Sequence, residues 1–498
     1  MKLMSKIRYI KNNYLVETII LIFAAFILIN TLFINPVLGR YNNGDFERLI
    51  IYGGLKNISN KYKDMYDKFL HINYLISYKD IFYPIYTNWV SEAIILKISV
   101  FIFLIIHGFN SHLFDIRYLA FVYSVLFLLG IFLIIKSKIF TIVVKITIGV
   151  FIILFFTSAC YITYFNSFFG EAGTIVFFFI TIGTYLNLIT KKSPNIRDFI
   201  YFFIASGGFL TSKPQVLPLL FFMLFVYMGL YMHYKESKYR KNIILCSVIV
   251  TFVCIFSYFS LSNTMNENNL YQSVFLGVLK DSKTPQEDLQ GLGINKKFIA
   301  FYGHSFYDKK FGLDPMGEEM LKEFYPNVSF GKILAFYLKH SDRIWEKIVS
   351  SASNAYNFSQ NNNYNFSDID EHDFIKGQYT SHKYVNNFRI KLIELFPHIH
   401  RNIYIFISFS SIYLLILIYY FIKKKHTRLL ILMLLFILIS GSSQLILPVI
   451  GSGYGDFGKH LFLLNFSYDI MLGISLLWIV HIISKLILFI KRKDSRCI

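Results

Sequence analysis

Four short groups of polar and charged residues stand at the ends of long apolar runs in this chain. They contain Asp45, Glu47 and Arg48; Asn166 and Glu171; Lys213; and Asp456, Lys459, His460 and Asp469. A carboxylate in such a group can act as a general base that takes the proton of an attacking hydroxyl. Cationic side chains can stabilise an anionic leaving group. Because ionisable groups at membrane depth usually face a water-filled cavity or one another, we expect the four groups to share one polar site.

The composition indicates the kind of protein that carries these residues. Of the 498 residues, 55% are hydrophobic, 19% aromatic and only 16% charged, which excludes an ordinary soluble domain. The formal net charge is +20, but the basic residues form short clusters between apolar runs. Such clusters indicate membrane topology rather than nucleic-acid binding. The four cysteines have no metal-binding or redox spacing. We therefore predict an all-α polytopic membrane protein with no nucleic-acid partner.

Ten apolar runs predict transmembrane helices, each of which needs about 20 residues. The predicted spans are about 17–38, 114–135, 139–158, 173–190, 198–212, 215–234, 242–261, 402–422, 428–448 and 462–490. Basic clusters occur at the N-terminus and then in every second loop. The positive-inside rule makes these loops and both termini cytoplasmic, so the polar groups face outward.

The spans divide the chain into three predicted parts. Residues 1–261 hold the first seven spans and a long first outer loop, 39–113, while 402–498 hold the last three spans. Residues 262–401 are expected to form a small outward domain or a lid. Within the first outer loop, residues 93–106 are too short to cross the membrane, and we expect an interfacial helix there.

Each candidate residue also has a purely structural interpretation. Glu171 and Asp469 can pair with a Lys or Arg of a neighbouring helix, and Lys213 can extend its ammonium group to the membrane interface. His460 can be an interfacial histidine whose hydrogen bonds are satisfied. The glycine-rich residues 451–458 do not follow a strand, which argues against a dinucleotide-binding loop.

Four phrases of the sequence resemble the GT-C superfamily of polytopic glycosyltransferases. The first is the Gly-Asp pair ending at Asp45, directly after the first span. The second is Gly208-Phe-Leu-Thr-Ser-Lys213-Pro, which is similar to the Leu-Thr-Lys-x-Pro element of transferases that use lipid-linked sugars. The phrases Tyr164-Phe-Asn-Ser-Phe-Phe-Gly-Glu171 and Gly455-Asp-Phe-Gly-Lys-His460 look most like those of bacterial glycan-biosynthesis hexose transferases. The second acidic motif of the superfamily is commonly a pair of Asp or Glu residues. This chain departs from that pattern, because Glu171 has no acidic neighbour in the sequence.

The resemblance implies a fold, substrates and roles for the candidate residues. It implies a GT-C-like membrane protein that transfers a hexose from a polyprenyl-phosphate donor to a glycan acceptor outside the cytoplasm, with inversion. Asp45 is then the general base, and the donor phosphate is bound by Lys213, Lys459, His460 and Arg48. Glu171 and Glu47 contact the acceptor or a divalent cation, and no metal is assigned. Asn166, Asp456 and Asp469 support the site.

Two other functional classes remain open at this stage. A lipid-linked glycan polymerase, ligase or flippase also has ten or more spans and a long outward loop. Against it stand the lack of internal symmetry between spans and the acidic motif directly after the first span. An anchoring or assembly protein without chemistry predicts that Asp45 and Lys213 can be replaced without loss of function.

Overall fold

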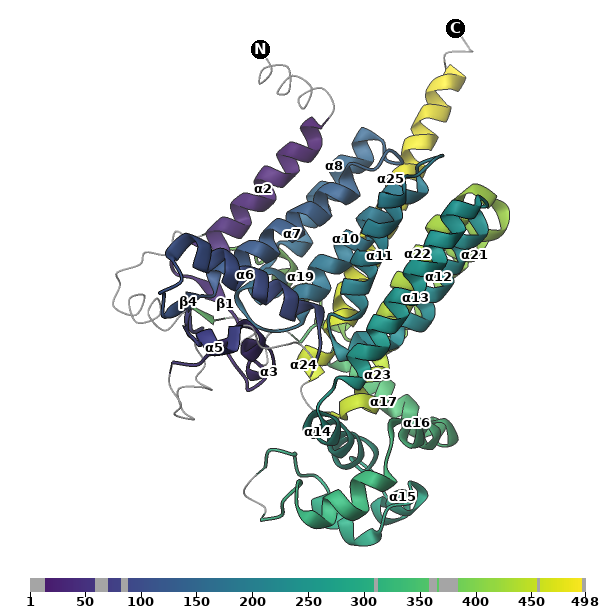
Figure 1. Ribbon diagram of the computed structural model, residues 1–498. Coiled ribbons are helices and arrows are strands. Elements are labelled where there is room, and N and C mark those ends of the chain that lie inside the picture. The colour runs from purple at the N-terminus through teal and green to yellow at the C-terminus, as the bar shows by residue number, and fades with distance from the viewer. Residues whose placement is uncertain are drawn as a thin grey trace.

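The computed structural model is a long bundle of helices with a smaller helical domain at one end (Figure 1). It describes residues 14–58, 70–81, 88–308, 312–357, 365–366, 384–454 and 457–494. Within these ranges, eight helical segments are long and apolar enough to cross a membrane. They are α2 (Leu15–Leu32), α7 (Arg117–Ile135), α10 (Glu171–Ile189), Pro214–His233, α13 (Ser237–Phe259), α21 (Ile403–Lys423), Lys425–Leu445 and Phe462–Leu486, which belongs to α25 (Phe462–Asp494). The prediction of an all-α polytopic membrane protein is confirmed.

Two of the ten predicted spans differ from this set. The run at 139–158 becomes α8 (Ile142–Phe156), which bends by 66° into the short segment Ala159–Asn166 and makes a ninth span if the pair is counted as one. The run at 198–212 becomes α11 (Ile196–Leu210), a helix of only 15 residues. At 1.5 Å per residue it is about 22 Å long, shorter than the hydrocarbon core of a bilayer. It ends at Thr211 because Pro214 cannot continue an α-helix, and the chain turns there into the 3-10 helix η3 (Pro214–Leu219).

Helix α10 forms the centre of the bundle and is the most completely buried of the spans. Aromatic side chains join it to its neighbours. Phe178 stacks on Phe209 of α11 with ring centroids 4.3 Å apart, and Phe179 lies 5.5 Å from Phe466 of α25. Helices in lipid pack through such close van der Waals contacts, because the surrounding lipid is as apolar as the side chains. This packing fixes the ends of α10, α11 and α25, from which candidate residues emerge.

The segment between α2 and α7 carries α6 (Ser91–His107), which includes the predicted interfacial segment. Figure 1 shows α6 running across the end of the bundle rather than along it. Three short strands, β2 (Leu55–Lys56), β3 (Asn73–Ile76) and β4 (Leu113–Asp115), pair antiparallel beside it, with Tyr74 opposite Phe114. Strand β1 (Leu38–Gly39) pairs with β5 (Asn365–Phe366). Strands β1 and β2 thus flank the loop that contains Asp45.

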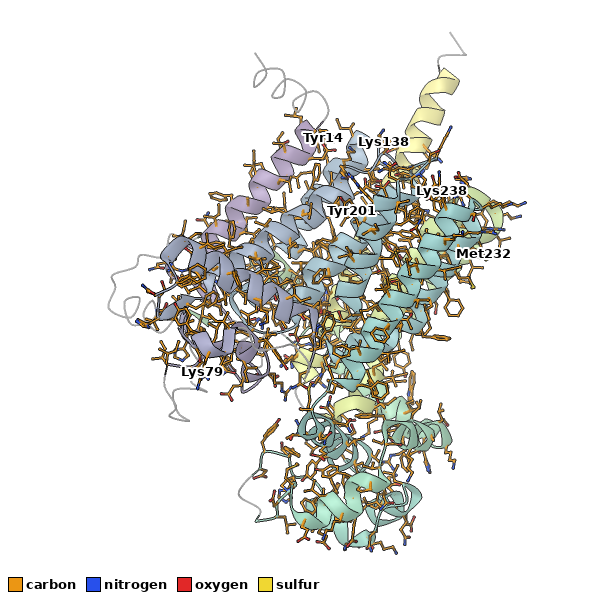
Figure 2. The ribbon with its side chains drawn as sticks, in the orientation of Figure 1. Tyr14, Lys79, Lys138, Tyr201, Met232 and Lys238 are labelled. Atoms are coloured by element: carbon orange, nitrogen blue, oxygen red, sulfur yellow. The ribbon has the colours of Figure 1, made fainter. Side chains whose placement is uncertain are left out.

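A helical domain follows the seventh predicted span. It contains α14 (Asn263–Ser273), α15 (Pro285–Gly291), α16 (Phe330–Lys339) and α17 (Ser341–Ser353). Its core is aromatic: Phe275 stacks on Phe324 at 5.1 Å and lies 4.6 Å from Tyr271. Figure 1 places this domain at the end of the bundle opposite the C-terminal part of α25. Figure 2 shows Lys138 and Lys238 at the same end as Tyr14, away from the helical domain.

Candidate active site

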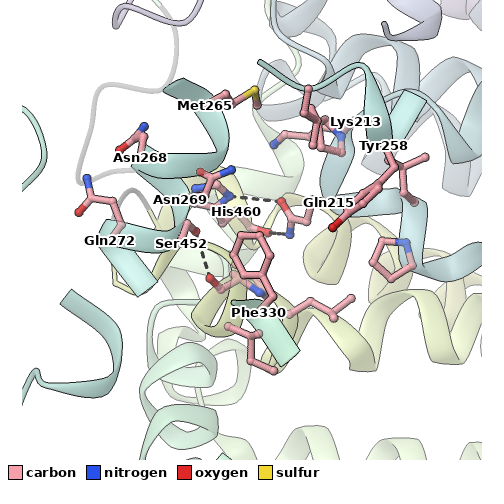
Figure 3. Close-up of a pocket in the computed structure, with 18 of the residues that line it drawn as sticks. Lys213, Gln215, Tyr258, Met265, Asn268, Asn269, Gln272, Phe330, Ser452 and His460 are labelled. Carbon is pink, nitrogen blue, oxygen red and sulfur yellow. Dashed lines mark hydrogen bonds between the residues drawn. The ribbon is translucent and has the colours of Figure 1, made fainter. Parts of the chain in front are cut away.

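A cavity of about 1000 Å³ lies where the bundle meets the helical domain (Figure 3). Its lining comes from the loop before α3 (Glu47–Ile50), from η3, from the end of α13 and from α14. Helices α23 (Leu447–Ser452) and α24 (Phe457–His460) also line it. Five of the residues proposed from the sequence line it together: Asp45, Arg48, Lys213, Lys459 and His460. Segments that are more than 400 residues apart in the chain therefore meet in one polar hollow.

Asp45 is held at the cavity by a tight loop. The side-chain oxygen of Asn42 accepts hydrogen bonds from the backbone nitrogens of Gly44, at 2.8 Å, and Phe46, at 3.3 Å. Gly44 has φ = +100°, a conformation that favours glycine. Phe46 is buried and packs edge-on against Phe169 with ring centroids 4.8 Å apart. Anchored on both sides, the Asp45 side chain stays partly exposed to the cavity.

Two cations contact the Asp45 carboxylate. Arg48 lies 3.1 Å from one carboxylate oxygen, and the ammonium group of Lys459 forms an ion pair with the other. The Lys459 ammonium also lies 4.3 Å from the centre of the Phe169 ring, a cation–π contact. The side chains of Lys459 and Asp45 are 14% and 25% exposed, so both remain within reach of a ligand.

Glu171 and Lys213 form a second ion pair beside the cavity, with nitrogen and oxygen 2.6 Å apart. Glu171 begins α10 and is fully buried, whereas Lys213 is 18% exposed and lines the cavity. The two elements approach closely because Gly170 has no side chain: a Cβ there would lie 2.9 Å from the carbonyl oxygen of Ser212. The hydroxyl groups of Thr174 and Ser212 join the same elements by a 2.8 Å hydrogen bond.

A second buried carboxylate, Glu92, lies next to Glu171. It comes from the first turn of α6 and is fully buried, against Gly173 of α10, where a Cβ would lie 1.9 Å from a Glu92 carboxylate oxygen. Burial raises the pKa of Glu92 well above its ordinary value, and the charge of Glu171 raises it further while Lys213 opposes both. The protonated, uncharged form of Glu92 is therefore favoured more strongly than in an exposed glutamate. This acidic pair is hard to predict from the sequence because its members are 79 positions apart, and the one signal is a glutamate at the start of a largely apolar segment.

His460 lies among the cations of the site. Its Nδ1 atom is 3.3 Å from the side-chain oxygen of Gln215, and its carbonyl oxygen accepts a 2.7 Å hydrogen bond from the Gln215 amide (Figure 3). Burial lowers the pKa of His460 well below its ordinary value, and the charges of Lys213, Lys459 and Arg48 lower it further. The imidazole is therefore neutral at pH 7 and offers hydrogen bonds rather than a positive charge.

A comparison with protein families shows which family the chain belongs to. Residues 4–496 match the family described as the YfdI N-terminal transmembrane domain. The chain belongs to this family. A comparison with curated proteins gave no significant match.

One solved structure is similar to this YfdI-family chain over most of its length. It is the archaeal oligosaccharyltransferase AglB from Archaeoglobus fulgidus in complex with an inhibitory peptide and a dolichol-phosphate. The match has a TM-score of 0.39 and 14% sequence identity. It covers 97% of this chain but 52% of AglB, so the chain spans about half the length of that protein.

The remaining candidate residues of this YfdI-family chain lie apart from the cavity or outside the described residues. Glu47 is exposed and accepts a 3.2 Å hydrogen bond from Asn57. The buried amide of Asn166 donates to the carbonyl oxygens of Leu32 and Leu38, both at 2.9 Å, and so connects α2 to β1. Asp456 lies outside the described residues.

Asp469 belongs to a separate buried network. Its carboxylate is 2.6 Å from Arg389 and accepts hydrogen bonds from Tyr161, at 2.7 Å, and Tyr356, at 2.9 Å. All four side chains are buried, and the network fastens the segment after the helical domain to α25. This is the structural pairing that the sequence left open for Asp469. A buried carboxylate needs such partners, because removing a charge from water is costly.

The described residues contain no group of three or more His, Cys, Asp and Glu side chains that could hold a metal ion. Of the acidic pair, Glu171 contacts Lys213 and Glu92 lies against Gly173. The pair therefore supplies only two carboxylates, and one of them is already paired with the Lys213 ammonium group. This is not a typical ligand set for a divalent metal. We assign no metal to the site.

Proposed function

We propose that this chain is a GT-C-like membrane glycosyltransferase that transfers a hexose from a polyprenyl-phosphate donor to a glycan acceptor, with inversion. The observation that carries the proposal is the single cavity in which a carboxylate, three cations and an apolar wall face one another. A carboxylate supplies a base, cations suit a phosphate, and an apolar wall suits an isoprenoid chain. These are the three requirements of the proposed reaction.

In this proposal the donor phosphate binds beside Lys213, Lys459 and Arg48, which all line the cavity. As the glycosidic bond breaks, its electron pair passes to the phosphate oxygen, and the growing negative charge is stabilised by fixed cations. The lipid chain runs along the apolar wall from η3 and α13, which includes Leu217, Ile255 and Phe259. Phe259 is exposed at the end of α13, so this wall opens toward the surface of the bundle.

Asp45 acts as the general base in this scheme. The acceptor hydroxyl loses its proton to the Asp45 carboxylate while its oxygen attacks the anomeric carbon from the face opposite the phosphate, which inverts that carbon. The cations that contact Asp45 weaken its basicity as long as they remain paired with it. A donor phosphate offers Lys459 and Arg48 a competing anion, so donor binding favours an available base.

Replacement of Asp45 tests this role. We expect Asp45→Asn to lower sugar transfer by about 10²–10⁴-fold while expression and membrane insertion remain normal, because Asn has the same shape but cannot accept the proton. Transfer is measured from the polyprenyl-phosphate sugar fraction to envelope glycan, both purified from cells that lack the gene. Glu318→Gln, an exposed carboxylate of the helical domain, is the matched control. A variant that keeps more than about a tenth of the activity rejects Asp45 as the base.

We further propose that both termini are cytoplasmic and that the cavity faces outward. In this arrangement residues 1–261 and 402–498 form the membrane part, and 262–401 form an extracytoplasmic part. The support is the basic residues, such as Lys138 and Lys238, at the end of the bundle away from the helical domain (Figure 2). A membrane-impermeant maleimide applied to intact cells should label Glu318→Cys but not Lys238→Cys, each in a Cys497→Ser background. The reverse labelling pattern refutes the orientation.

A further inference from the structure

The helical domain contributes an uncharged polar wall to the cavity. This wall consists of Asn268, Asn269, Gln272, Ser305 and Tyr307, and we call it the amide wall. Figure 3 shows its three amide residues on α14, with Lys213 and Tyr258 on another side of the cavity. The charged lining residues come instead from the segment around α3, from the start of η3 and from α24. One part of the cavity therefore suits an anion, and another suits a neutral ligand that forms hydrogen bonds.

Two side-chain amides of the amide wall have a hydrogen-bond partner for the nitrogen but none for the oxygen among the described residues. The Asn268 amide donates to the Tyr307 hydroxyl at 2.8 Å, and the Gln272 amide donates to the Ser305 hydroxyl at 3.3 Å. Their side-chain oxygens are buried and accept no hydrogen bond from any described residue. Turning either amide end for end would leave its NH₂ group without an acceptor instead. Each side chain therefore retains hydrogen-bonding capacity beside the cavity, and small rotations of its terminal torsion can present it to a ligand.

The amide wall is fixed relative to the rest of the site. Gly453, at the end of α23, has φ = +61°, and a Cβ there would lie 2.3 Å from the carbonyl oxygen of Gln272. The next residue, Tyr454, donates its backbone N–H to the carbonyl oxygen of Leu276 at 3.1 Å. This close contact joins α14 to the segment that leads to Lys459. A ligand bound to the wall is thus held at a constant position relative to the cations.

We infer that the amide wall binds the acceptor glycan and selects it through its uncharged sugar hydroxyls. This inference rests on the transferase function proposed above. Amide groups both donate and accept hydrogen bonds, as sugar hydroxyls do, and Tyr307, which is 63% exposed, offers a ring face for stacking. The wall is built on a helix and offers no strand edge on which a peptide could add. The donor sugar is covalently attached to the phosphate and stays near the cations, which leaves the wall to the acceptor.

Two volume-conserving substitutions test the inference. Asn268→Leu and Gln272→Met remove the hydrogen-bonding groups but keep the side-chain size. Because each removes a buried polar group without a full set of partners, the thermal midpoint of unfolding should stay unchanged or rise. The matched control is Gln290→Met, at an exposed glutamine on α15 of the same domain. The probes are envelope glycan and polyprenyl-phosphate sugar purified from cells that lack the gene, and undecaprenyl phosphate for direct binding.

We expect each variant to lower kcat/KM for the glycan by about five- to tenfold, the loss of roughly one hydrogen bond. The donor KM and the binding of undecaprenyl phosphate should not change. An unchanged kcat/KM for the glycan overturns the inference, and so does a rise in the donor KM, which would place the donor sugar on the wall. If the parent protein neither transfers sugar nor binds undecaprenyl phosphate, the proposed function itself fails, which is a separate result.

Discussion

The ion pair between Glu171 and Lys213 allows a structural role of Lys213 to be separated from a catalytic one. In Lys213→Met, the fully buried Glu171 carboxylate loses the partner that lies 2.6 Å away. Breaking a buried pair from one side costs about 3–5 kcal/mol, and we expect the lower part of this range, about 3 kcal/mol, because Lys213 is partly exposed. Adding Glu171→Gln removes the stranded charge and should restore about 2 kcal/mol of the free energy of unfolding.

Sugar transfer should respond differently from stability. Both Lys213→Met and the double variant lack the cation that we propose contacts the donor phosphate, so both should be inactive even though the double variant is stable. Unfolding is followed by SDS titration of the protein in detergent micelles, and transfer by the assay used for Asp45→Asn. The control is Lys56→Met, which breaks an exposed ion pair with Asp80 and should cost less than about 1 kcal/mol.

Two outcomes contradict this reasoning. If the double variant regains transfer, Lys213 only neutralises Glu171 and does not act on the phosphate. If Lys213→Met is as stable as the parent protein, the buried Glu171 side chain does not depend on its contact with Lys213.

Two further predictions follow from the buried carboxylates. Because the pKa of Glu92 is raised in the folded protein, its contribution favours folding below its ordinary pKa of about 4.5 and is lost progressively as the pH rises from there toward the raised folded pKa. Glu92→Gln should therefore flatten the decline of the unfolding free energy as the pH rises above about 4.5. An unchanged slope in SDS titrations at several pH values would mean that the pKa of Glu92 is not raised in the folded protein. Arg389→Met leaves the buried Asp469 carboxylate without its cationic partner and should destabilise the protein by about 3–5 kcal/mol. The kcat per folded molecule should stay normal. A lower kcat in the correctly folded fraction would instead connect Asp469 to the chemistry.

The sequence determined the helical architecture because membrane helices follow from composition alone. A run of about 20 apolar residues has to satisfy its own backbone hydrogen bonds in lipid, and only a helix does so within one segment. All ten predicted runs are accordingly helical in the structure, and the segment around 93–106 is a helix as well. The run at 198–212 is short already in the sequence, and α11 is no longer than that run because the turn at Pro214 ends it.

The sequence also determined which polar residues needed an explanation, since a charge beside an apolar run is costly wherever the run packs. Only the tertiary structure decided which of them share a site. It brings Lys459 to Asp45 and Lys213 to Glu171, adds Glu92 from α6, and leaves Asp469 in a separate network with Arg389. It also folds the stretch after the seventh predicted span into a helical domain whose α14 lines the cavity. The physical reason is that helix formation in a membrane is local, whereas the pairing of charges depends on contacts between helices that are far apart in the chain.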